Sequence, residues 1–450
     1  MKSFKIKSRI YLFSLILVSI VLSSCQSRPN RLISQSFPLP DEPLSAFGWV
    51  GVSFTEPMDH ESVDKSFSIS PPVGGEAFWQ ENTFWFRPID PFVQDTVYTA
   101  RLSGEVTTAE GRTASMDYTW EFTVRPPELL YFVPMDEGGE IWRASADGGN
   151  PRPLTATGGA ALEFAADRSG TWVAYSVLNN SGGSDLWLMD RDGADQRLLL
   201  NCGQDLCSEP AWSMDRVRIA YARVVYDTAA GGYDPAQVWT VDVASGETAQ
   251  LYQSEIAFGH SPSFSTDGHK LATYDTTQNA IRVLDLQTSQ ESGIPRTLPG
   301  SGDWSADSSQ ILFTDVLAAE NEPFVEIYIA DLASGEVDTA FKTPSTDTDF
   351  SQPRWHPEGN WLAVALRPVN ANITKALWVL PLSMGAPITV ADDPSANFSA
   401  YQWDPWGKTL AFQRLVLSGS ELQISIWCWD WETREAVQII EQGARPQWLP

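Results

Sequence analysis

The sequence is poor in basic residues, in histidine and in cysteine, and each shortage narrows what the protein can do. Only 30 Lys and Arg stand against 57 Asp and Glu, which gives a net charge of −27. Such a field repels phosphate backbones and anionic lipid headgroups, so we expect no nucleic-acid partner and no membrane attachment through a basic patch. The chain has four histidines and four cysteines, and the one close pair, Cys202 and Cys207, has no nearby histidine to complete a zinc site. We therefore expect no metal and no cofactor.

The N-terminus lacks an apolar run long enough to cross a membrane but has the pattern of an export signal. Positive charges stand at Lys2, Lys5, Lys7 and Arg9. The apolar run that follows, Ile10 to Leu22, is too short for a transmembrane helix and suits the core of a signal peptide.

The run ends in Leu22-Ser23-Ser24-Cys25, which resembles the bacterial lipobox. The resemblance implies that residues 1–24 are a lipoprotein signal peptide and that Cys25 carries the lipid. The protein would then be exported and anchored to the outer face of a bacterial membrane, in the cell envelope. The alternative is an ordinary signal peptide followed by an unrelated cysteine.

Two segments follow before the repeats begin. Residues 25–43 are rich in Ser, Pro, Asn and Gln without periodicity, which indicates a flexible tether. Residues 44–126 contain short runs that alternate with period two, which predicts a small β-sandwich. Phe54-Thr55-Glu56-Pro57-Met58-Asp59 and the later Trp120-Glu121-Phe122-Thr123 resemble a bacterial Ig-like domain family. This resemblance implies a spacer or adhesion module without an active site.

Residues 127–450 repeat a pair of short motifs. One motif is an apolar strand with a central aromatic or branched residue, which recurs at intervals of 44 to 52 residues: Trp142, Trp187, Trp239, Val283, Tyr328, Trp378 and Trp427. The other has an aromatic before a turn, as in Pro262-Ser263-Phe264-Ser265-Thr266-Asp267-Gly268. A period in this range with about four strands per repeat predicts an all-β propeller.

The two ends of the repeat region complement each other. The first repeat, from Leu129, lacks the aromatic-turn strand, and the last residues, Arg445 to Leu449, supply one. We therefore expect the final strand to complete the first blade, which gives seven blades, with six as the alternative. The repeats resemble TolB-like (WD40-like) propellers, a fold that serves many functions.

Candidate functional residues lie just before the aromatics of the inner strands. We expect them at the mouth of the central channel, where a protein or glycan partner could bind: Glu209, His260, Asp303, Gln352, Arg354, Gln402 and Arg445. The alternative is that these side chains only solvate the channel. Cys202 and Cys207 can close a small disulfide in an exported protein, and Cys428 is expected to be a buried thiol.

No catalytic pattern stands out. The alternating acids of Asp190 to Asp195 are better explained as a turn than as a calcium loop. Only His260 and His356 are expected near the starts of inner strands, too few for a metal-dependent lyase, and no Gly-x-Ser-x-Gly elbow occurs. We expect a monomeric binding or scaffold protein that is not an enzyme. The alternatives are an enzyme acting on polysaccharide through Glu209 and Asp303, and a structural envelope protein.

Overall fold

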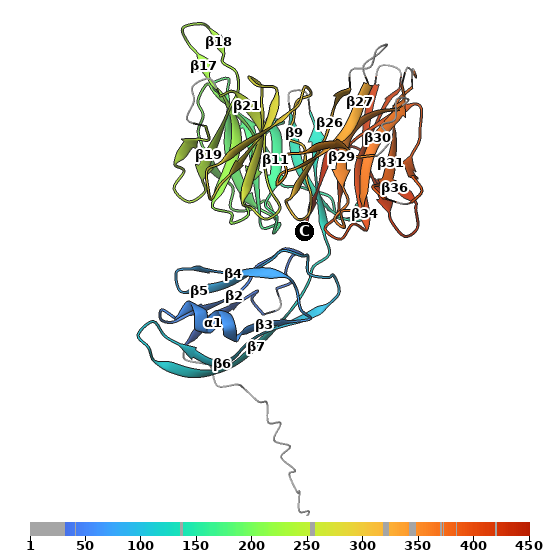
Figure 1. Ribbon diagram of the computed structural model, residues 1–450. Coiled ribbons are helices and arrows are strands. Elements are labelled where there is room, and N and C mark those ends of the chain that lie inside the picture. Colours follow the sequence, from blue (N-terminus) through green and yellow to red (C-terminus); the bar gives the residue numbers. More distant parts are fainter. Residues whose placement is uncertain are drawn as a thin grey trace, which may run out of the picture.

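The computed structural model describes residues 32–40, 42–135, 138–252, 257–317, 324–341, 348–369, 371, 373–383, 385–418 and 421–450. Cys25 and the predicted signal peptide lie outside these residues. In the described part, all regular structure except one short helix is β-strand. No helix there is long and apolar enough to cross a membrane. Figure 1 shows a small β-domain beneath a larger ring of sheets.

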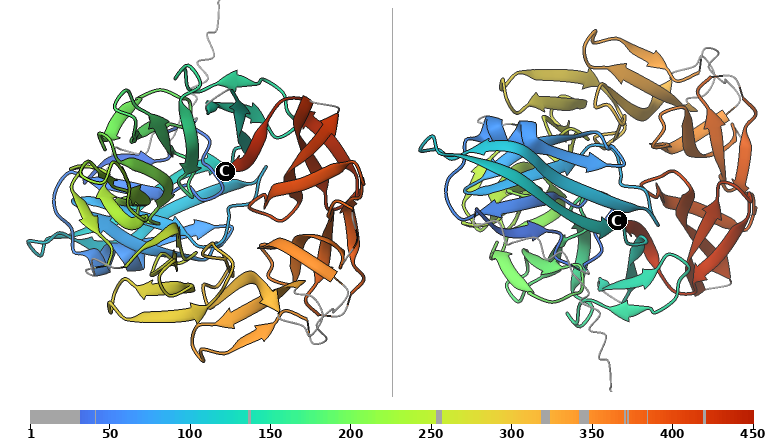
Figure 2. Two further views of the ribbon diagram at one scale, coloured as in Figure 1. Left: turned by 90° about the horizontal axis from the view of Figure 1, so that it is seen from above. Right: turned by 90° about the horizontal axis from the view of Figure 1, so that it is seen from below.

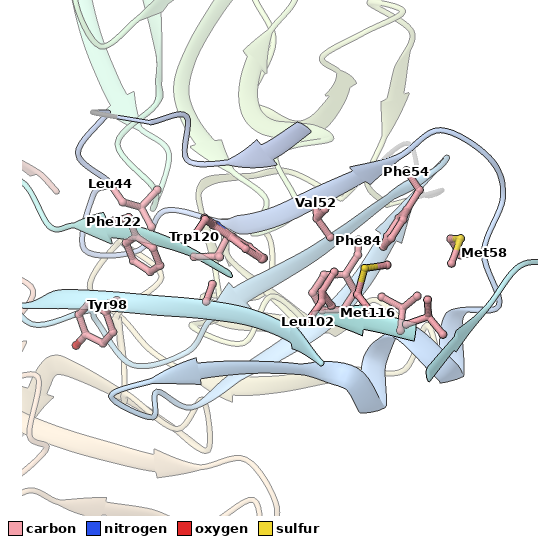
Figure 3. Close-up of a cluster of buried hydrophobic side chains, with 14 of the residues drawn as sticks. Leu44, Val52, Phe54, Met58, Phe84, Tyr98, Leu102, Met116, Trp120 and Phe122 are labelled. Carbon is pink, nitrogen blue, oxygen red and sulfur yellow. The ribbon is translucent and has the colours of Figure 1, made fainter. Parts of the chain in front are cut away.

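The small domain is a sandwich of two antiparallel sheets. One sheet has the order β1-β2-β5-β4 and the other the order β3-β6-β7. The strands are β1 (Ile33–Phe37), β2 (Val50–Phe54), β3 (Phe67–Ser70), β4 (Gly75–Gln80), β5 (Thr83–Pro88), β6 (Val97–Thr107) and β7 (Thr113–Thr123). Alternating residues of both sheets meet in one core that includes Val52, Phe84, Leu102 and Met116 (Figure 3).

The Pro-Met-Asp stretch after β2 has a direct structural role. Met58 is buried in the sandwich core, and Asp59 is the N-cap of α1 (His60–Ser66). Its carboxylate accepts the N–H of Ser62 at 2.9 Å, which satisfies one of the helix's free donors.

Strand β1 corrects the prediction of a tether over residues 25–43. Ile33–Phe37 pairs with β2, the Phe37 ring lies 4.8 Å from that of Trp85, and the indole of Trp120 donates to the Phe37 carbonyl. The segment has only two apolar residues, so its alternation was too weak to indicate a strand. Its structure comes from pairing with a distant strand, which the local sequence does not show.

Beyond the sandwich, strand pairing gives four separate four-stranded antiparallel sheets and one twelve-stranded sheet. Single-residue pairs, Ala161–Gly139 and Ser184–Leu206, join three four-stranded parts within the larger sheet, so the strands fall into seven groups of four, which we call blades 1 to 7. Blade 2 contains β11 (Ala161–Ala166), β12 (Trp172–Leu178), β13 (Ser184–Asp190) and β14 (Arg197–Leu200). Blade 3 contains β15 (Leu206–Trp212), β16 (Arg218–Val224), β19 (Gln237–Asp242) and β20 (Thr248–Gln250). Blade 4 contains β21 (Gly259–Phe264), β22 (Lys270–Asp275), β23 (Ala280–Asp285) and β24 (Glu291–Pro295). Figure 2 shows the blades arranged around a central axis.

Blades 5 to 7 follow the same plan. Blade 5 contains β25 (Asp303–Trp304), β26 (Gln310–Leu317), β27 (Phe324–Asp331) and β28 (Val337–Thr339). Blade 6 contains β29 (Thr348–Trp355), β30 (Trp361–Pro368), β31 (Ala376–Pro381) and β32 (Ile388–Ala391). Blade 7 contains β33 (Ala396–Trp403), β34 (Thr409–Ser418), β35 (Glu421–Asp430) and β36 (Ala436–Ile440). An extra hairpin, β17 (Tyr226–Asp227) with β18 (Gly232–Tyr233), extends from blade 3.

Blade 1 combines the two ends of the repeat region. Strand β37 (Ala444–Leu449) pairs with β8 (Glu128–Pro134), which pairs with β9 (Gly139–Ser145) and then β10 (Arg152–Pro153). The prediction of an all-β chain with an Ig-like sandwich and a propeller is confirmed. Closure of these groups into one ring of seven blades, with six as the alternative, stays a prediction.

Candidate functional site

The inner strand of most blades carries the same irregularity. Pairing with the second strand shifts register in β15, β21, β29, β33 and β37. At each shift one non-glycine residue has a positive φ: Glu209, Ser261, Gln352, Ala400 and Arg445. A β-bulge of this kind redirects the backbone N–H away from its own sheet. Three of the seven candidate residues are therefore bulge residues.

The redirected N–H groups of three bulges donate to the preceding blade. The N–H of Glu209 donates to the Glu163 carboxylate at 2.7 Å. The N–H of Ser261 donates in turn to the Glu209 carboxylate at 2.5 Å, and that of Arg445 to the Gln413 amide oxygen at 2.9 Å. Each acceptor side chain thus links two blades.

A second series of links uses the residue directly before the aromatic. Asp303 accepts the N–H of Trp355 at 2.7 Å, and Gln402 accepts that of Trp448 at 2.9 Å. Gln447 accepts the N–H of Ala166 at 3.3 Å. Tryptophan indoles reinforce these links, since Trp448 also donates its ring N–H to the Gln402 carbonyl at 3.0 Å.

The candidate residues form pairs rather than one cluster. Glu209 lies 3.9 Å from His260, whose Nδ1 contacts the Ser261 hydroxyl at 2.8 Å. Asp303 lies 3.1 Å from the Arg354 guanidinium. The remaining candidates are Gln352, which is exposed, Gln402, and Arg445, whose guanidinium donates to the Leu162 carbonyl.

Burial raises the pKa of Glu209 above its ordinary value, and the N–H of Ser261 opposes that shift. A raised carboxyl pKa is common at catalytic acids. Here the same carboxylate already accepts a backbone N–H from blade 4, so its position is explained by the link between blades. The arrangement does not favour a paired-carboxylate mechanism at Glu209 and Asp303.

Three residues that share these roles were not among the candidates. Glu163 and Gln447 each stand directly before an inner-strand aromatic, as Asp303 and Gln402 do. That position was a usable signal, but blade 2 begins with a degenerate motif and blade 1 is split between distant segments. Gln413 lies on the second strand β34, where nothing in the motif indicates contact with the next blade.

The prediction that His356 lies near the start of an inner strand is wrong. It follows the end of β29, is 2% exposed, and its Nε2 donates to the Gly407 carbonyl at 2.9 Å. Its Nδ1 accepts the N–H of Glu358, and burial lowers the pKa of His356. The ring is therefore a neutral packing group between blades 6 and 7.

The two other sequence features have local explanations. Asp190 Oδ1 accepts the N–H groups of Asp192 and Ala194, both at 2.8 Å, as expected for a side-chain-capped turn. Cys202 and Cys207 form a disulfide. No group of three or more His, Cys, Asp or Glu that could hold a metal occurs among the described residues.

The Ig-like sandwich packs against one face of the propeller. This face carries the turns between the first and second strands of each blade. The Arg216 guanidinium lies 3.3 Å from the centroid of the Trp49 ring, and the Trp406 indole donates to the Phe92 carbonyl at 3.0 Å. Arg168 lies over Phe47 and donates to Ile89 O at 2.9 Å.

The opposite face of the propeller, which we call the open face, carries the turns between second and third strands and the β17–β18 hairpin (Figure 1). Large apolar side chains are exposed in these connections: Met135, Tyr233, Ile373, Leu417 and Leu422. Leu417 and Leu422, 70% and 57% exposed, pair across the tip of blade 7. Four of the five belong to blades 6, 7 and 1, which are neighbours in the ring.

These features define an Ig-like sandwich joined to a propeller. Residues 43–124 match the family model of a bacterial Ig-like domain. No curated protein matches the chain.

Among solved structures, TolB from Acinetobacter baumannii is 18% identical, with 73% of this chain and 84% of that chain covered, at a TM-score of 0.41. The β-propeller domain of the Trilobed protease from Pyrococcus furiosus is 12% identical, with 78% and 97% covered, at 0.45. The Pyrococcus horikoshii acylaminoacyl peptidase is 13% identical, with 85% and 53% covered, at 0.49. At these scores the similarities carry no argument about function.

Proposed function

We propose that this chain is an extracytoplasmic, lipid-anchored binding protein of the bacterial envelope that presents the open face of its propeller to a protein partner. The observation that carries the proposal is the division of the two faces. The Ig-like sandwich packs on one face through Arg216, Arg168 and Trp406. The other face exposes large apolar side chains on three neighbouring blades. Clustered exposed apolar residues are typical of protein interaction sites.

The short N-terminal connection supports a stalk role for the Ig-like sandwich. Leu32 already belongs to its core, and Leu32 O accepts the N–H of Thr55. Leu32 follows Cys25 by only seven positions in the sequence. A fully extended chain of that length reaches at most ~25 Å. A lipid on Cys25 would therefore keep the sandwich close to the bilayer.

The anchor is tested by expressing the full chain and its Cys25→Ser variant in a bacterial host. We expect the parent to incorporate labelled palmitate and to fractionate with membranes, while the variant does neither. Equal labelling of both proteins contradicts the anchor at Cys25.

The binding face is tested with a photo-crosslinking residue at Leu422 on the open face and, as a control, at Val437. Val437 is 58% exposed, close to the 57% of Leu422, but lies on the outer strand β36 of the same blade. In living cells we expect a discrete adduct from position 422 and none from position 437. Equal adducts, or none from position 422, contradict the proposed face.

A further inference from the structure

A cavity of about 430 Å³ lies between blades 6 and 7. Its volume falls within the range of small-molecule sites, roughly 300–1,000 Å³. One wall is the end of β32 and the connection that follows it, and the other is the face of blade 7 turned toward blade 6. Six lining residues have chemistry suited to a ligand: Asp392, Asp393, Phe398, Phe412, Arg414 and Trp427.

The aromatic part of the cavity comes from three adjacent strands of blade 7. Phe412 on β34 is directly opposite Trp427 on β35, and the Phe398 and Phe412 rings are 5.9 Å apart in an edge-to-face arrangement. The two phenylalanines are buried and the Trp427 ring is partly exposed. The cavity therefore has an apolar floor and an accessible indole.

The polar part adds both donors and acceptors. Arg414 pairs with Asp393 and lies 5.7 Å from the Trp427 ring. Asp393 also accepts the N–H and the hydroxyl of Ser395. A guanidinium has five N–H donors, so Arg414 retains donors beyond its bond to Asp393. Asp392 is exposed and makes no hydrogen bond or ion pair with the residues that the structure describes.

Blade 3 also contains an arginine, an aspartate and a tryptophan close together, but there the arginine donates more hydrogen bonds to the aspartate. Arg223 lies 5.0 Å from the Trp239 ring and donates twice to Asp205, at 2.9 and 2.7 Å. Asp205 also accepts the N–H of Tyr226. There two arginine N–H groups donate to the same carboxylate oxygen, Oδ2, while Oδ1 accepts the N–H of Tyr226. In blade 7 the pair is a single contact, next to a cavity.

We propose that the cavity between blades 6 and 7 binds the end of a neutral saccharide. A pyranose ring has an apolar C–H face that fits the partly exposed indole of Trp427, and its hydroxyls can donate to Asp392 and accept from Arg414. The two carboxylates outnumber the single guanidinium, and the chain carries a net charge of −27. Anionic sugars are therefore disfavoured. The Thr374 hydroxyl donates to the Asp393 carbonyl, so the cavity borders the open face next to Ile373. Sugar binding and crosslinking at position 422 are independent readouts, so either proposal can fail without the other.

The test is saturation-transfer NMR on the full chain, with glucose, galactose, mannose, N-acetylglucosamine and maltose as probes. Any sugar that binds is then titrated. Galacturonate serves as the anionic counterpart. We expect saturation of at least one neutral probe, and weaker transfer to galacturonate. No transfer to any neutral probe, or tighter binding of galacturonate, overturns the proposal.

Variants then locate the binding. Trp427→Ala should weaken the bound sugar at least tenfold, whereas Trp378→Ala, at the corresponding strand of blade 6 and outside the cavity, should not. Asp392→Asn changes an exposed side chain and cannot unfold the blade, so it tests the site independently. We expect it to weaken binding several-fold. Unchanged affinity in both Trp427→Ala and Asp392→Asn overturns the assignment to this cavity.

Discussion

Replacing Trp448 by alanine tests the pairing of the chain's last strand with the first strand of the propeller. Trp448 is 5% exposed in a core shared with Leu129, Tyr131 and Ile426, and its indole donates to the Gln402 carbonyl. Loss of a buried tryptophan costs about 3–5 kcal/mol. The lost hydrogen bond adds about 1 kcal/mol. We expect the free energy of unfolding of the propeller to fall by about 4–6 kcal/mol.

The assay combines guanidinium unfolding with hydrogen exchange of the β8 amides, because the sandwich can unfold separately from the propeller. Trp448→Phe keeps a ring in the core and removes the indole donor, so it should cost only about 1–2 kcal/mol. Val437→Ala changes an exposed residue of β36, the outer strand of blade 7, and should stay within about 0.5 kcal/mol of the parent. A Trp448→Ala variant as stable as Val437→Ala, with β8 amides still protected, refutes the reasoning.

Four further outcomes are expected. Arg216→Ala should cost about 0.5–2 kcal/mol of docking between sandwich and propeller, seen as a larger radius of gyration in solution scattering, and an unchanged radius contradicts it. Replacing Cys202 and Cys207 together by serine should destabilise blade 3 by about 2 kcal/mol, because the closed loop is short, and unfolding midpoints with and without reductant measure this. Burial raises the pKa of Cys428 to about 12, so its thiol should resist a disulfide reagent at pH 8 until the protein unfolds, and rapid labelling of the native protein counts against it. Hydrogen bonds from Ser395 and Arg414 lower the pKa of Asp393 to about 2. The ionised Asp393 therefore stabilises the fold above the pKa it has in the unfolded chain, and this stabilisation is lost as the pH falls toward 2. The melting temperature of Asp393→Asn, measured against pH, should lack this loss.

The sequence predicted the parts of the fold whose signal is local and repeated. Period-two alternation and the recurring aromatic, such as Trp239 and Trp427, located the strands of most blades. The leftover half-motif at Trp448 predicted the pairing with β8, which the structure contains. The close spacing of Cys202 and Cys207 was also informative, because it predicted the disulfide that the structure contains.

The parts that sequence could not provide depend on pairing between distant segments. Strand β1 has little alternation and forms only because β2 lies beside it. Glu163 accepts a backbone N–H from a residue 46 positions away, and Gln413 one from a residue 32 positions away. Such contacts depend on the register of bulges, which a motif count does not reveal. For that reason polar residues such as Glu209, which the sequence predicted at the channel mouth, resembled a binding site although their contacts link blades.

The distinction between repeated and unrepeated residues indicates where function resides. A carboxylate or amide that links one blade to the next serves the architecture, whatever the protein binds, so Asp303 and Gln402 carry little information about a ligand. Features that break the repeat have no such structural obligation. The β17–β18 hairpin and the exposed Leu417–Leu422 tip each occur in one blade only among those described. The Arg414–Asp393 pair borders a cavity. Because the fold does not require these features, they are the positions at which we expect contacts with a protein partner or a sugar.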